Sequence, residues 1–440
     1  MIIRKAGSLK GTLRVPGDKS ISHRAVMLGS LARGETYVSG FLKSADCLAT
    51  IDCFRRMGVS IEEMKTADKA PCLIIRGKGL HGLSAPQSPL DAMNSGTTAR
   101  ILSGILAGQS FSSAIIGDAS LSRRPMKRVI EPLSAMGCRI ASAKDNGCLP
   151  LLIEGGNLHG IRYVSPVASA QVKSCILMAG LYADSPTTVI EPALSRNHTE
   201  LMLQGFGGFA EAFTDPESNL PACRIQPQPE LIGRSIRVPG DISSAACFIA
   251  AGLLLPNSEI TLTGVGVNKT RDGILRVAKA MGGRIEMSNI RSEGGEMAAD
   301  LHISSSKLVG TLIEGDLIPT LIDELPAIAL MAACAEGKTV IRDAGELRVK
   351  ESDRLDLICR NLKAMGVTLS ESRDGMVIEG RPLSDKPLSG TRIDPSGDHR
   401  IAMAFAAAGL LAEGETEILD PDCVRISYPD FFRDLSSLIQ

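Results

Sequence analysis

The alternation of polar and hydrophobic positions repeats along the chain. Each repeat opens on small polar and charged residues near a Pro or Gly, then enters an apolar run of helical length that a Gly or Pro closes. In the first repeat this predicts a helix over 22–32, a strand over 35–39, an amphipathic helix over 45–57 and two further strands. Each repeat therefore predicts a βαβαββ unit. Six copies occur, beginning near Pro16, Asn94, Pro166, Pro239, Leu321 and Pro395.

The six repeats fall into two halves. The segment LRVPGDKSIS at Leu13 is nearly identical in sequence to IRVPGDISSA at Ile236, so the fourth repeat begins a second set of three repeats. The first helix of several repeats is apolar on all sides, as over 248–255 and 328–335, and a helix of this kind is buried. We therefore predict an α/β protein of two similar domains, each with three repeats around a buried helical core.

The chain ends indicate where the domains divide. The first repeat lacks a complete set of strands before Pro16, and the last runs to Gln440 without a following sheet. The two ends are therefore predicted to complete one domain together. The chain would cross between domains at Pro16 and Pro239, and these two crossings would form a hinge, because Pro fixes φ and Gly permits turns. The predicted domains are 16–237 and 1–15 plus 238–440.

Composition narrows the range of functions. With 44% apolar and 22% charged residues, the 440-residue chain has the profile of a folded protein, and its net charge of -1 gives no overall attraction to nucleic acid or anionic membranes. Only 3% of the residues are aromatic, and no stretch reaches the ~18 uninterrupted apolar residues that a membrane span needs. The N-terminus also lacks the apolar segment of a signal peptide. We expect a soluble, cytoplasmic monomer that binds neither nucleic acid nor membrane.

Common cofactor and metal motifs are missing from the sequence. The eleven cysteines are scattered singly, without the Cys and His spacing of a zinc site. No P-loop, GxGxxG fingerprint or GxSxG elbow is present. We therefore expect neither a metal nor a cofactor.

Polar clusters at the starts of the apolar helices form the candidate site. Unpaired backbone N–H groups and the helix dipole make such N-termini anion-binding positions. Further cations occur in the runs 123–128 and 348–354, and on a helix Lys350 and Arg354 would share a face. The cations within the clusters are Lys19, Arg24, Arg100, Lys173 and Arg400.

These features also have an ordinary interpretation. A charged run such as 123–128 is common on solvated surfaces, and Ser243 and Ser244 suit helix capping, which is worth about 1 kcal/mol for each residue. The recurrence of cations before apolar helices favours an anion site, because surface charge has no reason to recur at matching positions. Among the six histidines, His399 is the best site candidate, since it lies in the polar start of the last repeat.

Seven short motifs follow one another along nearly the whole chain. They are PGDKSISHR at Pro16, NSGTTAR at Asn94, RPMKR at Arg124, SAQVKS at Ser169, LIDELP at Leu321, RVKESDR at Arg348 and GDHRIAMAF at Gly397. This set resembles the 5-enolpyruvylshikimate-3-phosphate synthase family, a branch of the enolpyruvyl transferases. The resemblance implies domains built as inside-out α/β barrels that close over shikimate 3-phosphate and phosphoenolpyruvate. It also implies a transferase of the shikimate pathway and aromatic amino acid biosynthesis, which moves the enolpyruvyl group to the 5-hydroxyl and releases phosphate.

The resemblance assigns residues to each substrate. Asp323 is the implied base for the 5-hydroxyl, and proton transfer at the methylene carbon is left open between Glu351 and Lys19. The implied shikimate 3-phosphate set is Lys19, Ser20, Arg24, Ser169, Ala170, Gln171, Ser195, Arg196, Asp323 and Lys350. The implied phosphoenolpyruvate set is Lys19, Gly96, Arg128, Gln171, Arg354 and Arg400.

The chain departs from the family pattern at several positions. Ala170 stands where some members have a second Ser, Glu346 where some have Asn, and Arg425-Ile426 where some have Lys, so a C-terminal phosphoenolpyruvate contact is left unassigned.

Two alternative functions share the fold. One is UDP-N-acetylglucosamine enolpyruvyl transferase, whose mobile loop carries a reactive Cys that 117–129 lacks. The other is a non-catalytic anion-binding protein, which would have no need of Asp323 and Glu351.

Overall fold

The chain separates into two compact units. The structure is a computed structural model that describes residues 1–65, 71–385 and 387–440. Unit 1 contains residues 1–16, 239–291 and 297–440, and unit 2 contains residues 17–238 and 292–296. The short segment 292–296, placed by the sequence pattern with the second half of the chain, belongs to unit 2, where Glu296 hydrogen-bonds with His198.

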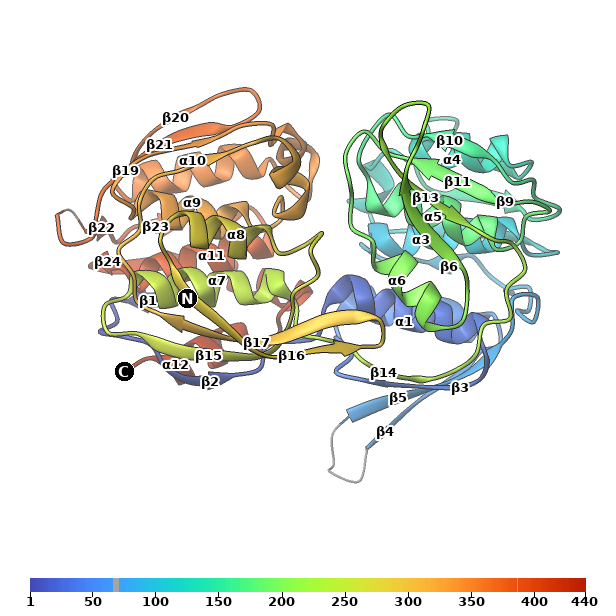
Figure 1. The fold of residues 1–440 in the computed structure, drawn as a ribbon, viewed down its shortest axis with the longest axis horizontal. Coiled ribbons are helices and arrows are strands. Elements are labelled where there is room, and N and C mark those ends of the chain that lie inside the picture. The colour runs from blue at the N-terminus through green and yellow to red at the C-terminus, as the bar shows by residue number, and fades with distance from the viewer. Residues whose placement is uncertain (66–70, 386) are drawn as a thin grey trace. The chain divides into compact units, whose positions relative to one another are not determined.

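Each repeat of unit 2 folds into one four-stranded sheet with two helices (Figure 1). In every sheet one edge strand runs parallel to its neighbour, and the other two pairings are antiparallel. The first sheet has the order β14 (Ser235–Arg237), β3 (Arg33–Ser39), β5 (Pro71–Lys78), β4 (Ser60–Lys65). The second is β6 (Leu90–Asp91), β7 (Ser112–Ile116), β9 (Leu151–Glu154), β8 (Arg139–Ser142). The third is β10 (Arg162–Val164), β11 (Thr187–Ile190), β13 (Pro221–Ile225), β12 (Ala210–Thr214).

Unit 1 repeats this plan, with a shorter last sheet. Its first sheet has the order β16 (Arg284–Glu293), β17 (Glu296–Ser304), β15 (Glu259–Gly266), β2 (Lys10–Leu13). The second is β18 (Leu312–Ile313), β19 (Gly337–Ile341), β21 (Met376–Gly380), β20 (Thr368–Glu371). The third is β1 (Ile2–Arg4), β25 (Glu415–Ile418), β23 (Arg392–Ile393), accompanied by the pair β22 (Leu388–Ser389) and β24 (Ala412–Glu413). The N-terminal strand β1 pairs antiparallel with β25 in the sheet of the last repeat.

Two strands are exchanged between the first and the fourth repeat. Strand β2 precedes the first helix of unit 2, but it pairs in parallel with β15 of unit 1. Strand β14 precedes the first helix of the fourth repeat, but it pairs in parallel with β3 of unit 2. Each exchanged strand leads directly into a crossing from one unit to the other, at Pro16–Gly17 and at Val238–Pro239.

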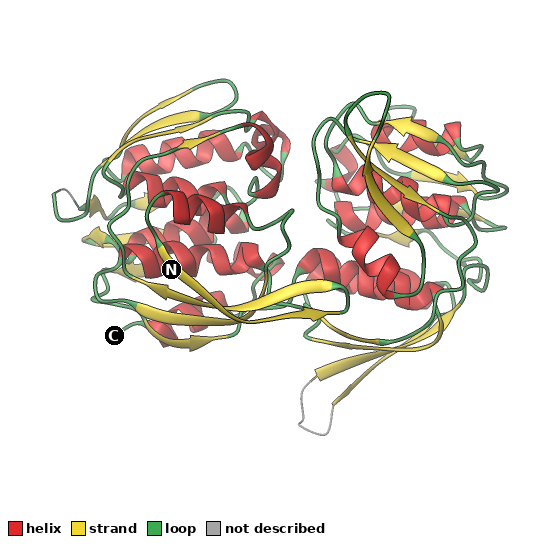
Figure 2. Cartoon of the chain, in the orientation of Figure 1, coloured by secondary structure: helices red, strands yellow, loops and turns green. Residues whose placement is uncertain are grey.

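The first helix of each repeat is more completely buried than the second. Figure 2 shows the helices in red and the strands in yellow. The first helices are α1 (Lys19–Leu31), α3 (Gly96–Ala107) and α5 (Ala170–Gly180) in unit 2, and α7 (Ile242–Leu254), α9 (Leu325–Ala333) and α11 (His399–Gly409) in unit 1. The second helices are α2 (Ala45–Arg56), α4 (Lys127–Ala135), α6 (His198–Gly205), α8 (Gly273–Ala280), α10 (Arg354–Ala364) and α12 (Phe431–Leu438). Short 3₁₀ segments are η1 (Leu121–Arg123), η2 (Gly315–Thr320), η3 (Gly345–Val349) and η4 (Pro421–Ile426). The predicted α/β class, the repeated unit and the buried helical core are confirmed.

Aspartate and serine side chains cap the starts of the buried helices α1, α3, α7 and α11. Helix α1 begins three residues before the predicted position, because Asp18 accepts a hydrogen bond from the backbone N–H of Ile21 at 2.9 Å. Ser95 caps α3, while Asp241 and Asp398 cap α7 and α11 in the same way. Helix α7 is therefore capped by Asp241, while the hydroxyl of Ser243, one of the two serines that suited capping, donates to Glu324 Oε1 instead.

Helices α3 and α5 approach so closely that a glycine is required between them. A Cβ atom added to Gly104 of α3 would overlap the backbone carbonyl oxygen of Cys175 in α5. Because both partners are helix backbone, relief requires the two helices to separate. The small residues of the apolar runs thus set the spacing of the core.

Gly104→Ala is expected to destabilise the protein by about 2–3 kcal/mol, the upper part of the usual range for overpacking, because the clash is with backbone. Urea unfolding measures the change. Gly156→Ala is the matched control, since nothing lies within 4 Å of its added Cβ, and it should leave the unfolding midpoint unchanged or slightly raised. Equal midpoints for the two variants would contradict the close approach.

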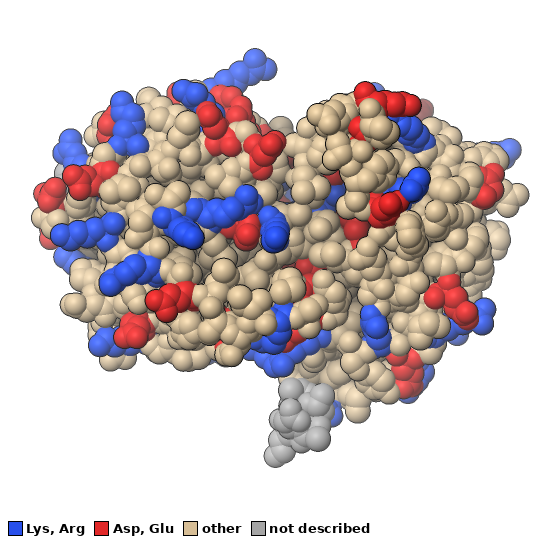
Figure 3. Space-filling view, viewed as in Figure 1, with Lys and Arg blue, Asp and Glu red and all other residues tan. Residues whose placement is uncertain are grey.

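The surface carries mixed charge. On the face shown in Figure 3, basic and acidic side chains are interspersed, in agreement with the net charge of -1. Within the described residues, no helix is long and apolar enough to span a membrane. The same residues contain no group of three or more His, Cys, Asp or Glu side chains suited to a metal ion.

Candidate active site

The N-terminus of α1 presents the first predicted site residues. Lys19 is the first residue of the helix, and its ammonium forms an ion pair with Asp46 in the first turn of α2. Asp46 is itself buried, so it fixes the lysine side chain while leaving part of it accessible. The next residue, Ser20, contributes its carbonyl oxygen to Arg24.

Arg24 joins three helices of unit 2. Its Nε donates to Thr199 Oγ1 of α6 at 2.7 Å, its Nη2 donates to Ser174 Oγ of α5 at 2.7 Å, and its Nη1 donates to Ser20 O at 3.0 Å. The side chain is buried, and this burial lowers the pKa of Arg24 to about 10, although Glu200 opposes the shift. Arg24 therefore holds the starts of α1, α5 and α6 together as an arginine cation.

The starts of α3 and α5 are also connected. Arg100 Nη1 donates to Gln171 Oε1, and Gln171 Nε2 donates to Thr97 Oγ1 at 3.0 Å. Gly96, the first residue of α3, leaves space that the Arg100 guanidinium approaches. At α5, Ser169 is the N-cap residue but its side chain makes no capping bond, and Ala170 follows as the first helical residue. The hydroxyl of Ser169 is thus not committed to the helix.

The loop between β11 and α6 carries two further members of the implied shikimate 3-phosphate set, Ser195 and Arg196. Lys173 of α5 donates to the carbonyl oxygen of Ser195 at 3.4 Å, which connects this loop to the helix that bears Gln171. Arg128 lies in α4 of the same unit, which packs against α3 and α5, but no hydrogen bond or ion pair of the described residues joins it to the others. Its neighbour in sequence, Arg124, instead donates to Asn94 Oδ1 at 2.9 Å.

In unit 1 a single arginine gathers three carboxylates. Arg354 Nε donates to Asp398 Oδ2 at 2.8 Å, Nη1 to Asp323 Oδ1 at 3.0 Å and Nη2 to Glu351 Oε2 at 2.6 Å. Only 1% of the Arg354 side chain is exposed. The two carboxylates predicted to move protons, Asp323 and Glu351, therefore share one guanidinium.

The segment 348–354 is not a continuous helix, so the prediction that Lys350 and Arg354 share a helical face is wrong. Helix α10 begins at Arg354, because Asp353 caps it by accepting a bond from Asp356 N–H at 3.1 Å. Lys350 lies outside, at the end of η3, where its ammonium is 3.4 Å from Glu346. The break releases Glu351 from the helix and lets it reach Arg354.

Charge in this cluster shifts the titration of its acids. The Glu351 side chain is partly buried, with 39% of its surface exposed, and protein atoms lie around its carboxylate. This burial would raise the pKa of Glu351, but Arg354, His399 and Arg400 outweigh it and hold the pKa well below its usual range. In the same way, burial opposes and Arg354 lowers the pKa of Asp398. Both groups are carboxylates at neutral pH.

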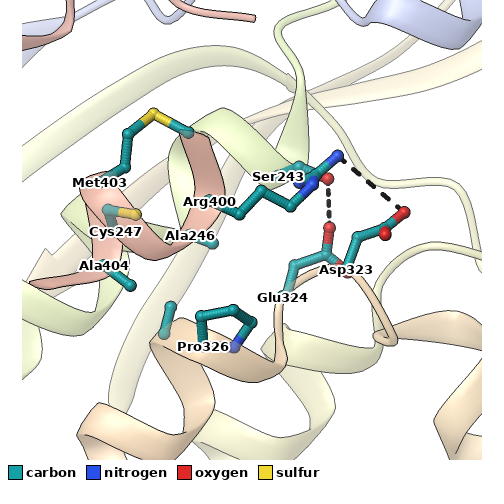
Figure 4. A pocket seen from close by; sticks show the side chains of 10 residues that line it. Ser243, Ala246, Cys247, Asp323, Glu324, Pro326, Arg400, Met403 and Ala404 are labelled. Carbon is teal, nitrogen blue, oxygen red and sulfur yellow. Dashed lines mark hydrogen bonds and ion pairs between the residues drawn. The ribbon is translucent and has the colours of Figure 1, made fainter. Parts of the chain in front are cut away.

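A small cavity lies beside these groups (Figure 4). Its free volume is about 10 Å³, which is about the space of one water molecule. Asp323 and Arg400 line it, and an ion pair of 3.9 Å joins their side chains. Ser243 and Glu324 line it as well, and the Ser243 hydroxyl donates to Glu324 Oε1. Arg400 thus reaches the same carboxylate as Arg354 does.

The sequence interpretation missed the partners of these residues. Asp46, Asp398 and Glu324 lie at or next to helix starts and hold the cations or hydroxyls named above. Acidic residues at a helix start were a visible signal, but such residues are ordinary capping residues and gave no indication of a partner. Arg271, which donates to Ser243 Oγ at 2.7 Å, had no sequence signal.

Solved structures define the class of protein to which this fold belongs. The enolpyruvyl transferase NikO from Streptomyces tendae matches with a TM-score of 0.79 and 18% identity, covering 99% of this chain and 96% of that chain. At that identity the likeness shows the fold alone. EPSP synthase from Acinetobacter baumannii matches with a TM-score of 0.89 and 44% identity, covering 100% of this chain and 97% of that chain. The fold is that of the enolpyruvyl transferases.

The sequence comparisons identify the family within this class. The model of the EPSP synthase (3-phosphoshikimate 1-carboxyvinyltransferase) family matches residues 3–435. A 3-phosphoshikimate 1-carboxyvinyltransferase from Citrifermentans bemidjiense is 50% identical over 438 residues, covering 100% of this chain and 99% of its own. One from Desulforudis audaxviator is 52% identical over 436 residues, covering 99% and 98%. The chain belongs to the EPSP synthase family.

Family membership confirms the predicted activity. The protein is a transferase of the shikimate pathway that moves the enolpyruvyl group of phosphoenolpyruvate to the 5-hydroxyl of shikimate 3-phosphate and releases phosphate. The full-length match favours this activity over UDP-N-acetylglucosamine enolpyruvyl transfer and over a non-catalytic anion-binding role.

Proposed function

We propose that the residues gathered at the helix starts of unit 2 hold most of the shikimate 3-phosphate molecule. In this proposal the phosphate meets Ser195 and Arg196. Supporting this, helix starts and cations favour anions, and the hydroxyl of Ser169 makes no capping bond. The proposed set is Lys19, Ser20, Arg24, Ser169, Ala170, Gln171, Ser195 and Arg196, with Asp323 and Lys350 from unit 1.

We assign phosphoenolpyruvate to a second set of groups. Among the described residues, Arg354 uses three of its N–H donors on carboxylates, and we assign the second hydrogen of each Nη to the carboxylate of the substrate. Arg400 adds a second cation beside Asp323. A planar guanidinium suits the carboxylate and phosphate groups of this substrate. The proposed set is Lys19, Gly96, Arg128, Gln171, Arg354 and Arg400.

In the addition step, Asp323 is the proposed base. Its carboxylate takes the proton of the 5-hydroxyl while the hydroxyl oxygen forms a bond to C2 of phosphoenolpyruvate. The methylene carbon next to C2 accepts a proton at the same time. The single observation that carries this proposal is the position of Asp323 and Glu351 on one buried guanidinium, since Arg354 keeps both acids close to the same cation.

Elimination reverses the proton transfers. A base removes a proton from the new methyl group, the C2–O bond to phosphate breaks, and inorganic phosphate leaves. Glu351 suits this step, because its low pKa makes it a carboxylate at neutral pH. For the preceding protonation of carbon the donor is Glu351 or Lys19, and the proposal retains both, because Glu351 must first receive a proton. Positioning and electrostatic stabilisation supply most of the acceleration.

Phosphate release tests the acceptor. The purified protein is mixed with phosphoenolpyruvate and either shikimate 3-phosphate or UDP-N-acetylglucosamine, without metal or nucleotide. We expect release of phosphate with shikimate 3-phosphate only, because the cation sets above suit a small phosphorylated acid. Release with the sugar nucleotide alone would contradict the proposal, and release with neither would support an anion-binding role without catalysis.

We propose that the protein acts in the cytoplasm and as a monomer. All eleven cysteines are free thiols, as is usual for proteins of reducing compartments. Burial raises the pKa of most of them, for example that of Cys47 to about 12, which keeps the thiols protonated and unreactive. Sedimentation of the purified chain checks the oligomeric state.

A further inference from the structure

A buried lysine of unit 2 uses all of its donors on one small region. Lys173 lies in the second turn of α5, and only 2% of its side chain is exposed. Its ammonium is 2.8 Å from Glu191 Oε2, 2.8 Å from Glu200 Oε1 and 3.4 Å from the carbonyl oxygen of Ser195. These three partners account for the three N–H donors of a lysine.

The three partners delimit one loop. Glu191 follows β11, Glu200 lies in the first turn of α6, and Ser195 lies between them. The backbone of Ser195 is held at both polar groups, because its N–H donates to Glu191 Oε2 at 3.5 Å and its carbonyl accepts from Lys173. Among the described residues, the buried hydroxyl of Ser195 has no hydrogen-bond partner. The loop backbone is therefore fixed while this hydroxyl stays available.

Stability alone gives a weak reason for such a cluster. Taking a lysine and two glutamates out of water is costly, and apolar side chains of similar volume often stabilise a core as well or better. The two glutamates nevertheless raise the pKa of Lys173 above its usual value despite the effect of burial, so the lysine is charged. A charged cluster of this kind is better explained by the geometry that it imposes on the loop.

We propose that Lys173 is a positioning residue for the phosphate of the acceptor substrate. It connects α5, which bears Gln171, to the loop that bears Ser195 and Arg196, and it fixes the backbone of Ser195 so that its hydroxyl and the following arginine face the phosphate. Lys173 itself, at 2% exposure, does not touch the substrate. This inference rests on the proposed function, in which Ser195 and Arg196 bind that phosphate.

Charge-matched variants test the proposal. Lys173→Met leaves two buried carboxylates without their cation, so the double variant Lys173→Met with Glu200→Gln is made beside it and keeps the net charge of the cluster. Glu191→Gln is a milder change that keeps the shape of the side chain. Lys43→Met, at an exposed pair with Glu63, is the control. Circular dichroism establishes which variants fold.

Affinity for shikimate 3-phosphate and for shikimate, which lacks the phosphate, is measured by titration calorimetry. We expect the double variant to lose at least tenfold in affinity for shikimate 3-phosphate and Glu191→Gln to lose about threefold, with affinity for shikimate unchanged. The KM of phosphoenolpyruvate at saturating acceptor should also stay unchanged. A purely structural role would lower thermal stability without this phosphate-specific loss, and that result in the folded variants would overturn the proposal.

Arg196→Ala separates this inference from the function on which it rests. If Arg196→Ala leaves the affinity for shikimate 3-phosphate intact, the assigned phosphate site is wrong. If Arg196→Ala weakens binding while every folded variant at Lys173 and Glu191 binds normally, the positioning role alone is wrong. In the expected case, the Lys173 change costs little further affinity once Arg196 is already missing.

Discussion

Asp323→Asn is expected to lower turnover by roughly 100- to 10,000-fold, the usual contribution of a general base. The amide keeps the size of the side chain and an oxygen for the bond from Arg354, but it cannot take the proton of the 5-hydroxyl. Binding of shikimate 3-phosphate should survive nearly intact. Steady-state phosphate release measures the turnover, and calorimetry measures the binding.

The control for this prediction is an aspartate outside the site. Asp52 of α2 is half exposed and forms a surface pair with Arg56, so Asp52→Asn should leave turnover and binding unchanged. If Asp323→Asn retains turnover within a few-fold of the unchanged protein, Asp323 is not the base. A loss of binding that matches the loss of turnover would instead leave Asp323 only its part in holding the acceptor, without the role of base.

Arg354→Met is expected to have the largest effect on stability, because the arginine is buried among three carboxylates. Removing one partner of a buried ion pair usually costs about 3–5 kcal/mol. Here Asp398, Asp323 and Glu351 all lose a partner. Urea unfolding measures the loss, and phosphate release should fall as well, since the same guanidinium is assigned to phosphoenolpyruvate. Arg354→Lys keeps the positive charge but loses the planar guanidinium with its several N–H donors. The unfolding free energy of Arg354→Lys should therefore lie between those of the unchanged protein and Arg354→Met.

The stability difference should depend on pH in a defined direction. With Arg354 present, the pKa of Asp398 is depressed, so its contribution is complete above the unfolded value of about 4 and is lost as the pH falls through the lower folded value. Without the arginine, burial would raise the carboxyl pKa values, and protonation would relieve the variant. The difference in unfolding free energy between the unchanged protein and Arg354→Met should therefore shrink as the pH falls from 7 to 4.

Arg360 supplies the matched control on the same helix. Its side chain is 52% exposed and lies 3.7 Å from Asp394, so Arg360→Met should change stability by less than about 0.5 kcal/mol and show no such pH dependence. A gap between Arg354→Met and the unchanged protein that stays constant with pH would contradict the assigned network.

Much of the fold was predictable from local pattern. The six βαβαββ repeats follow from the alternation of turn residues, apolar helices and strands, and the burial of α7 and α9 follows from helices without a polar side. The predicted domain boundaries already separated β2 from the first domain and kept β14 in it, but the strands with which β2 and β14 pair were not predictable in this way. The period of a strand sequence does not specify which strand it pairs with, because the partner residues lie 198 positions away for β14 and 249 positions away for β2.

The candidate site was also predictable only in part. Motifs indicated Asp323, Glu351 and Arg354, but the sequence placed Lys350 and Arg354 on one helical face. In the structure they do not share a helix, because Asp353 caps α10 and the helix begins only at Arg354, after Lys350. Likewise, Lys173 was visible only as one more cation before an apolar helix. Its role became an inference once Glu191, Ser195 and Glu200 were found around it.

The sequence by itself determined the repeated unit, the buried helices and the residue types of an anion site, because periodicity and helix starts are local properties of the chain. Only the tertiary structure decided which carboxylate pairs with which cation. Arg354 is the first residue of α10, its three carboxylates come from the segments preceding α9, α10 and α11, and Lys173 of α5 pairs with glutamates on either side of the loop before α6. Ion pairs between distant segments form where backbones bring the charges within a few ångströms, and burial then makes each pair matter.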